Sequence, residues 1–207
     1  MASKDPAVRT RLSGSERRAQ IARAAEALAR RQGLDAVTLR AVAAEVGVGS
    51  ALVAHHAPSM EDVVADAFQA IVAAELADLE RLRDRHADPV VVVRELLGTL
   101  LDGTRSDVTL IWVQSWALGG RNEALAARVR AQMDAWTEFL EGIVRAGTAA
   151  GRFRVDDPGA VAAQLLGMID GLNAHALVSW RDAAGRIRLM STAVEAMLGL
   201  ESNELGG

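Results

Sequence analysis

The sequence predicts an all-α protein of about nine helices, and three observations lead to this prediction. Apolar residues recur at spacings of three and four along most of the 207 residues, which is the period of a helix face. Ala, Leu and Arg are the three commonest residues, while Tyr is absent and Phe occurs 3 times, so the composition favours helix over strand. Glycine and proline stand between the periodic segments, where they begin or end helices. No segment is predicted as a strand.

The composition excludes several classes of protein. Because the chain has no cysteine, disulfides and thiolate metal sites are ruled out. No apolar run approaches the roughly 20 residues needed to span a bilayer. The first residues, Met-Ala-Ser-Lys-Asp-Pro, also lack the apolar core of a secretory signal. We therefore expect a soluble cytoplasmic protein with no membrane partner.

The net charge of −4 conceals an asymmetry along the chain. Residues 1–56 carry nine Lys or Arg against five Asp or Glu, a net charge of +4. Residues 57–207 carry fourteen basic and twenty-two acidic residues, a net charge of −8. A basic N-terminal segment followed by an acidic remainder indicates that the N-terminal segment binds a polyanion. The alternative is that it is only a solvated tail.

Capping residues and glycines predict three short helices near the start of the chain. Ser15 is a suitable N-cap for a helix that Gly33 ends, and Thr38 is a suitable N-cap for a helix that Gly47 ends. The segment 50–56 is long enough for a third helix. We expect a disordered arm over residues 1–14 and a helix-turn-helix domain over residues 15–59.

Start and stop signals divide the rest of the chain into longer helices. Ser59, followed by Glu61 and Asp62, begins a connecting helix over residues 60–85. Residues 86–207 are predicted to form a larger helical domain, in which Gly185 separates the last two helices. The helices expected there cover residues 90–103, 110–118, 122–150, 159–180 and 187–199.

The segment from Thr38 to Ser50 has the physical features of a helix-turn-helix. A short helix ends at Gly47, which can adopt the left-handed conformation that the turn needs. Small side chains at Ala43 and Ala44 let the second helix approach the first closely. The second helix is then free to enter a major groove with its first residues near the base edges.

Here the sequence resembles the TetR family of transcriptional regulators. The match covers residues 17–64, and the Asp-Gly-Leu run at residues 170–172 is also similar to the family. The resemblance implies that residues 86–207 bind a small-molecule effector among the central helices and form a homodimer through the last two helices. The matching features are the Arg-rich first helix, Gly33-Leu34, Thr38, the run from Ala43 to Val48, His56, Ser59 and Glu61.

Two departures from the family concern phosphate binding. The family usually has Tyr and Lys where this chain has Ala54 and Met60, and neither of these side chains can contact a phosphate. Phosphate contacts provide most of the non-specific affinity for DNA. Compensation by other groups, among them Arg17, Arg18, Arg40 and His55, is one interpretation, and a degenerate head is the other.

The predicted contacts to DNA combine base-reading and supporting residues. Ser50 and His55 can each donate or accept a hydrogen bond at a base edge, although Ser50 is equally a capping residue. His56 matches a family position that supports the fold. The adjacent histidines point about 100° apart and have no third ligand, so we expect no metal site. The full predicted DNA-binding set is Arg17, Arg18, Thr38, Arg40, Ser50, His55 and His56.

A cluster of aromatic residues marks the candidate effector site. Trp112 and Trp116 lie four residues apart and share one helix face, and Met133, Trp136 and Phe139 follow on the next helix. Ordinary core packing explains each residue taken singly. The family resemblance instead implies a pocket for an apolar or aromatic effector between these helices.

Asp170 stands in a helix that is otherwise nearly apolar. A buried carboxylate is costly unless it is paired, so Asp170 can neutralise a cationic effector. The alternative is a structural role, because the family often has Asp at this position.

These observations predict a DNA-binding regulator, in the family's usual mode a repressor that a small molecule releases from a palindromic operator. A small-molecule-binding protein with a degenerate DNA-binding head is the alternative. An enzyme is not expected, because the sequence has no nucleophile–base pair, no metal triad and no phosphate loop, and no cofactor is predicted.

Overall fold

The structure is a computed structural model that describes residues 12–206, and most of the predicted disordered arm lies outside these residues. The described residues contain nine α-helices and one short 3-10 helix and no strand, which confirms the all-α prediction. None of these helices is both long and apolar enough to cross a bilayer. The helices are α1 (Gly14–Gln32), η1 (Leu34–Ala36), α2 (Leu39–Val46), α3 (Ser50–His56), α4 (Met60–Arg83), α5 (Pro89–Leu101), α6 (Ser106–Gly119), α7 (Glu123–Ala149), α8 (Pro158–Ala176) and α9 (Ala183–Leu198).

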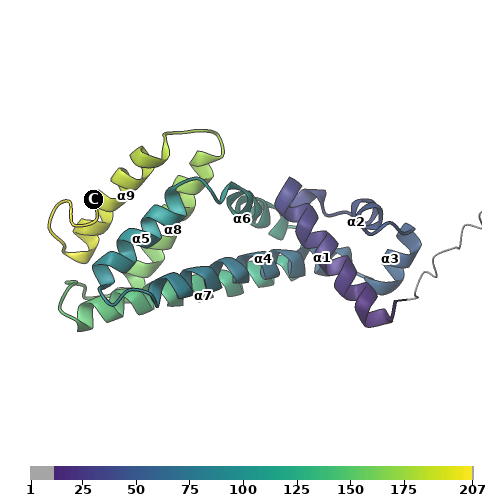
Figure 1. Cartoon of the computed structure of the whole chain (residues 1–207), viewed down its shortest axis with the longest axis horizontal. Coiled ribbons are helices and arrows are strands. Elements are labelled where there is room, and N and C mark those ends of the chain that lie inside the picture. Colours follow the sequence, from purple (N-terminus) through teal and green to yellow (C-terminus); the bar gives the residue numbers. More distant parts are fainter. Residues whose placement is uncertain (1–11, 207) are drawn as a thin grey trace, which may run out of the picture.

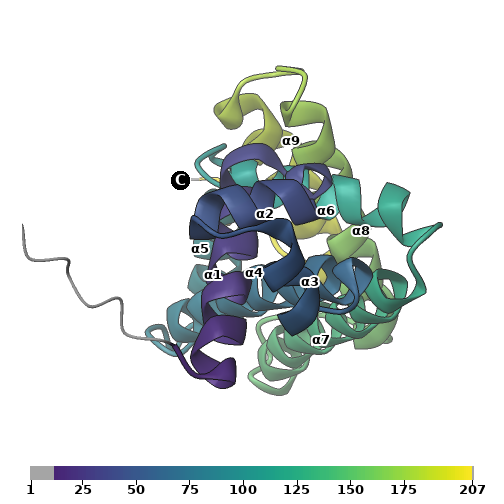
Figure 2. The same cartoon turned by 90° about the vertical axis from the view of Figure 1, so that its right-hand side faces the viewer.

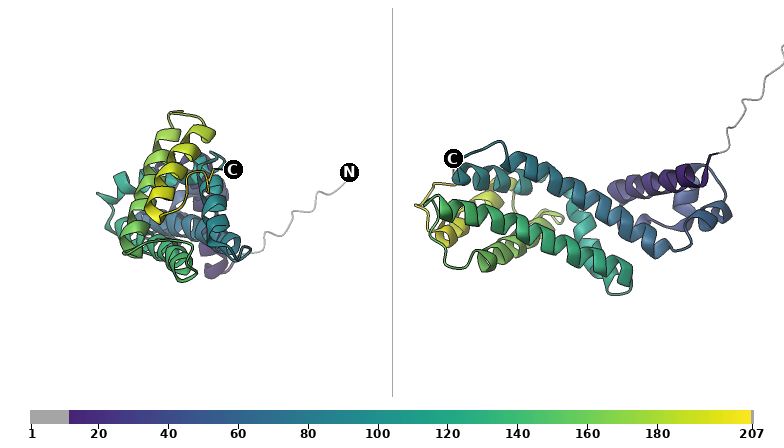
Figure 3. Two further views of the ribbon diagram at one scale, coloured as in Figure 1. Left: turned by 90° about the vertical axis from the view of Figure 1, so that its left-hand side faces the viewer. Right: turned by 90° about the horizontal axis from the view of Figure 1, so that it is seen from below.

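The molecule is elongated, with α1, η1, α2 and α3 gathered at one end as a small head (Figures 1 and 2). Helices α5, α8 and α9 form the opposite end. Helices α4 and α7 run side by side along the body, and α4 continues into the head, as the view from below shows (Figure 3). They run in the same direction: Asn122 before α7 donates a hydrogen bond to the Glu61 carbonyl at 3.2 Å, and the Arg83 guanidinium stacks over the Phe139 ring.

Helix α4 contributes side chains to the hydrophobic core of the head and to that of the body. Its first half packs against α1 of the head, and its full length packs against α7. Phe68, Ile71, Val72 and Leu79 are each at most 1 % exposed, so the buried stripe is continuous from the head into the body. The head is therefore attached to the body through a shared hydrophobic core.

The first helix begins earlier than the sequence analysis expected. Ser13, rather than Ser15, is the N-cap, and its side chain accepts a hydrogen bond from the Glu16 amide at 3.2 Å. The Glu16 carboxylate accepts in return from the Ser13 amide at 2.7 Å. This reciprocal pair satisfies two amides that a helix start otherwise leaves unpaired.

The boundary between α8 and α9 also differs from the prediction. Helix α8 ends at Ala176 rather than near residue 180, and Ser179 and Arg181 then adopt positive φ angles of 60°. Asp182 caps α9 by accepting from the Gly185 amide at 2.7 Å. The predicted separator Gly185 thus lies inside the first turn of α9. Helix α6 likewise begins at Ser106, four residues before the predicted start.

Gly147 on α7 is a position where packing forbids a side chain. A Cβ atom there would overlap the ring of Phe153, which is 3 % exposed. Gly142 on the same helix has no heavy atom within 4 Å of an added Cβ. The two glycines therefore form a matched pair for mutation. At Gly147 an added methyl group would displace the Phe153 ring, whereas at Gly142 it would meet no neighbour.

We predict that Gly147→Ala lowers the free energy of unfolding by about 1–3 kcal/mol, because Phe153 must leave its position. Gly142→Ala should instead raise it by about 0.5–1 kcal/mol through the better helix propensity of alanine. Urea unfolding followed by circular dichroism measures both. Equal effects of the two substitutions would contradict the packing argument.

Candidate functional site

The α2–turn–α3 unit has the geometry expected of a helix-turn-helix. The Thr38 side chain caps α2 by accepting from the Ala41 amide at 3.2 Å. Gly47 is left-handed, with φ 71° and ψ 38°, and the Val48 amide donates to the Ala43 carbonyl at 3.0 Å. Val42 and Val53 are fully buried, so the two helices are fixed against each other and against α1.

Helix α3 presents a largely apolar surface to solvent. Ala51, Leu52, Ala54 and His55 are exposed, whereas Val53 is buried. Gly49 occupies the N-cap position, and no side chain caps the helix, so Ser50 does not act as the cap. Leu52 is 38 % exposed, and the sequence analysis did not include it among the predicted DNA contacts. Its position next to Val53 in α3 is the sequence signal that could have identified it as an exposed residue.

Four of the predicted DNA-binding residues gather where α1 begins and α3 ends. The rings of His55 and His56 meet edge to face with centroids 4.9 Å apart. Burial lowers the pKa of His56, and the positive charges of His55, Arg17 and Arg18 lower it further. Arg17 also donates to Gln20 Oε1 at 2.7 Å. In this basic cluster, His56 therefore loses its proton more readily than an isolated histidine does.

Arg40 and Thr38 lie outside this basic cluster, at the start of α2, and both are exposed. A cavity of about 510 Å³ opens beside the cluster, between α1 and α4. Glu26, Asp62 and Asp66 line it together with Arg18 and His56. Because three carboxylates face this cavity, it does not favour a phosphate.

Trp112 is the centre of the aromatic cluster in the body. Its ring meets Phe68 edge to face at 5.1 Å and Trp136 at 6.5 Å, and it lies tilted to Trp116 at 6.1 Å, each distance joining ring centroids. Trp136 is buried, and Trp116 is 36 % exposed. The structure thus brings three of the predicted aromatic residues together and adds Phe68 from α4.

The other two predicted residues of α7 lie apart from this cluster. Met133 is 37 % exposed, and Phe139 is buried below the Arg83 guanidinium, which lies 5.5 Å from the ring centroid. Two polar atoms nearby on α7 are buried without a hydrogen-bond partner among the described residues, the indole nitrogen of Trp136 and the amide oxygen of Gln132. The cluster therefore has an unpaired donor and an unpaired acceptor on α7, each of which has an unmet hydrogen bond within residues 12–206.

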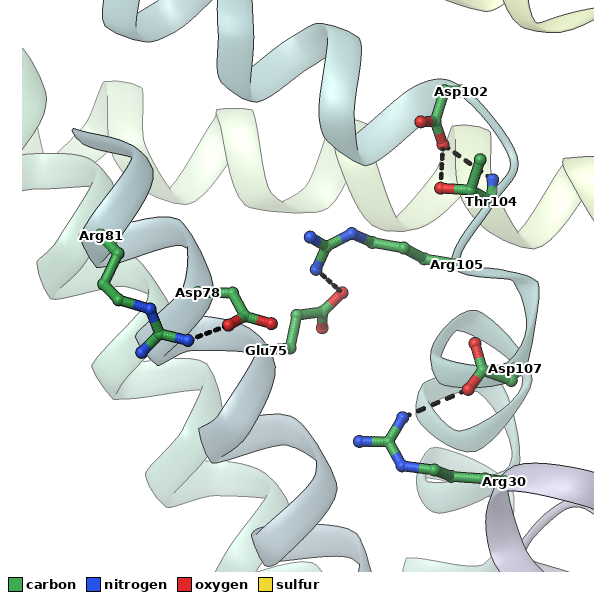
Figure 4. A network of polar contacts seen from close by, with 8 residues as sticks. All are labelled: Arg30, Glu75, Asp78, Arg81, Asp102, Thr104, Arg105 and Asp107. Atoms are coloured by element: carbon green, nitrogen blue, oxygen red, sulfur yellow. Dashed lines mark hydrogen bonds and ion pairs between the residues drawn. The ribbon is translucent and has the colours of Figure 1, made fainter. Parts of the chain in front are cut away.

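Two carboxyl groups lie among the same helices. Glu75 on α4 is 7 % exposed and accepts a hydrogen bond from Arg105 at 3.3 Å (Figure 4). Burial raises the pKa of Glu75, against the opposing effects of Arg105 and the Trp112 indole. Burial, and next the charge of Glu75, raise the pKa of Asp170 on α8 to about 6.

Asp170 has no hydrogen bond or ion pair with any of residues 12–206. When both carboxyl groups are ionised, the single guanidinium of Arg105 leaves the pair with one net negative charge. A cation beside an aromatic face is stabilised by such a charge and by the ring itself. Sequence analysis missed Glu75, although it stands at an apolar position in the stripe that contains Phe68, Ile71 and Leu79.

Two domains of TetR-type regulators match the chain, and together they cover most of its length. Residues 21–67 match the bacterial regulatory proteins of the TetR family. Residues 92–199, which are more than half of the chain, match the C-terminal domain of BetI-type transcriptional repressors. No curated protein matches the chain.

Solved structures share the whole fold. A candidate transcriptional regulator from Saccharomonospora viridis, in complex with choline, is 25 % identical with a TM-score of 0.74, over 87 % of this chain and 96 % of that chain. One from Pseudomonas aeruginosa PAO1 is 20 % identical with a TM-score of 0.76, over 97 % and 98 %. A candidate TetR-family regulator from Rhodococcus sp. is 19 % identical with a TM-score of 0.73, over 89 % and 99 %.

The family matches cover the helix-turn-helix and most of the body, and the solved structures have the same arrangement of helices. The chain therefore belongs to the TetR family of transcriptional regulators, and its head is the family's DNA-binding domain.

Proposed function

We propose that the protein is a homodimeric repressor that binds a palindromic operator in the cytoplasm and is released from it by a cationic small molecule. The observation that carries this proposal is the carboxyl group of Asp170, which has no partner among residues 12–206. Glu75 lies near this carboxyl group and also near Trp112 of the aromatic cluster. The exposed α3 helix supplies the contact to DNA.

The effector class follows from the chemistry of the site. A cation with apolar substituents is recognised by aromatic faces and a nearby carboxylate, and quaternary ammonium groups are the usual case. The buried and unpaired Trp136 indole and Gln132 amide suit a ligand that also carries a hydroxyl or carbonyl group. Choline in the Saccharomonospora viridis protein has both features, which makes choline a suitable first probe.

The dimer is proposed at α8 and α9. Trp180 and Val178, which follow α8, are 43 % and 79 % exposed, and Leu189 on α9 is 47 % exposed. Large exposed apolar groups on consecutive elements favour a protein partner. A second copy of the chain also fits, because two-fold symmetry places two recognition helices on a palindromic site.

We predict that Arg40→Ala weakens binding to all DNA sequences and reduces the slope of log affinity against log salt by about one, as expected for one lost phosphate contact. Arg145→Ala, an exposed arginine far along α7, is the control and should leave the slope unchanged. Fluorescence anisotropy on a duplex selected from genomic fragments measures both. Failure of the intact protein to select any duplex would instead favour the degenerate head.

We predict that the affinity for choline rises about tenfold between pH 5 and pH 7, because ionisation of a carboxyl group with a pKa of about 6 restores the negative charge. Asp170→Asn should bind choline weakly and without this pH dependence, and Asp134→Asn at an exposed position of α7 should retain it. Calorimetric titration measures these affinities. Equal binding of the uncharged isostere, in which carbon replaces nitrogen, would rule out a cationic site.

We predict that Leu189→Asp makes the protein monomeric at micromolar concentration, because an unpaired carboxylate would be buried at the dimer interface. Leu52→Asp adds the same charge at an exposed leucine of α3 and should leave the dimer intact. Sedimentation equilibrium distinguishes the two states. An intact protein that is already monomeric at this concentration would refute the proposed dimer.

A further inference from the structure

Helix α6 lies between the effector site and the head and contacts both. At its start, Arg105 reaches Glu75 inside the body, while Asp107 pairs with Arg30 of α1 at 3.2 Å (Figure 4). In its middle, Trp112 packs on Phe68 and Trp136 of the effector cluster. Side chains two positions apart on a helix differ by about 200° in direction, so they lie on nearly opposite faces. One face of α6 is therefore turned toward the effector cluster and the other toward the head.

Gln114, two residues after Trp112, makes the most specific of these contacts with the head. Its Oε1 accepts a hydrogen bond from the Leu34 amide at 2.5 Å, and its Nε2 donates to Asp35 Oδ1 at 3.0 Å. Leu34 and Asp35 belong to η1, the turn that joins α1 to α2. One side chain of the body thus satisfies both a donor and an acceptor of the head.

The head is shaped to receive this side chain. Gly33 adopts φ 90° and ψ 169°, and a Cβ atom there would overlap the Gln114 amide. A glycine at this position therefore fits both the conformation and the close approach of Gln114. Leu34 itself is 1 % exposed, so the anchored turn is also fixed in the hydrophobic core of the head.

We infer that Gln114 is the positioning residue through which the state of the effector site reaches the DNA-binding head. A displacement of Trp112 by an effector moves α6, and the two hydrogen bonds of Gln114 carry this movement to the η1 turn, from which α2 begins. Arg30 and Asp107 form a second link, but that ion pair is exposed on both sides and contributes little. This inference rests on the proposed function, in which effector binding and DNA binding are coupled.

The first test needs neither operator nor effector. Amide hydrogen exchange over residues 39–56 is measured in the full-length protein, in Trp112→Phe, in Gln114→Ala and in the double variant. Trp112→Phe should accelerate exchange in the head at least threefold, and the same change should have less than a 1.5-fold effect when Gln114 is already alanine. An equal effect of Trp112→Phe in both backgrounds, or no effect in either, would overturn the inference.

The second test measures the coupling itself, as the ratio of the DNA dissociation constants with and without saturating choline. We expect about a tenfold ratio in the unaltered protein, which corresponds to about 1.4 kcal/mol of coupling. The ratio should fall below twofold in Gln114→Ala and to an intermediate value in Gln114→Glu, which keeps the acceptor for Leu34 but repels Asp35. A merely structural role would change both dissociation constants together and leave the ratio unaltered.

The matched control is Gln32→Ala, at an exposed glutamine that ends α1 and makes no side-chain hydrogen bond with the described residues. It should behave as the unaltered protein in both tests. If choline has no effect on DNA binding of the unaltered protein, the proposed effector class fails, and the exchange cycle still decides the role of Gln114. A full tenfold ratio in Gln114→Ala would contradict the inference directly.

Discussion

The buried stripe of α4 is the constraint on which the rest of the structure depends. A helix of 24 residues is about 36 Å long, so it reaches from the head into the body and serves two cores at once. Phe68 shows this double role, because it lies near the head and also packs edge to face against Trp112 of the body. A shift of α4 at either end therefore disturbs packing at the other, as dense protein interiors transmit strain.

A charged residue in this stripe has a cost that packing alone does not explain. Glu75 occupies a position at which leucine or valine would continue the apolar face, and burial raises its pKa. Arg105 compensates in part, since it donates to the carboxylate, but Asp170 adds a second acidic group that has no partner among residues 12–206. A buried and incompletely paired charge such as Glu75 destabilises a fold, and this cost is the physical reason for proposing a binding role for Glu75 and the half-buried Asp170.

Local signals predicted most of the helices, and contacts between distant residues account for what was missed. The pattern Ser13-x-x-Glu16 is a visible capping box, and giving it precedence over Ser15 would have placed the start of α1 correctly. The end of α8 depends on positive φ angles at Ser179 and Arg181, which their residue types do not favour. The spacing of Trp112 and Trp116 predicted a shared face.

The parts of the candidate site that the sequence did not indicate come from other helices. Phe68 and Glu75 lie on α4, and Gln114 meets a turn eighty residues earlier in the chain. Neither periodicity nor capping carries information over such separations, because both patterns describe a single helix. The predicted set from Trp112 to Phe139 was drawn from two neighbouring helices, which is why it included the separate Phe139 and the exposed Met133.

The distribution of charge determines how the protein can approach DNA. The basic groups of the head lie on α1, α2 and α3, and three of the nine basic residues in the first 56 belong to residues 1–11. The body carries an excess of eight negative charges and is repelled by a polyanion. Acidic residues reach as far as Asp62 and Asp66, where α4 leaves the head. Among the described residues, the positive charge that can attract DNA thus lies on the head. With Ala54 and Met60 in place of the Tyr and Lys that are usual in the family, the proposed DNA contact depends strongly on the arginines of the head.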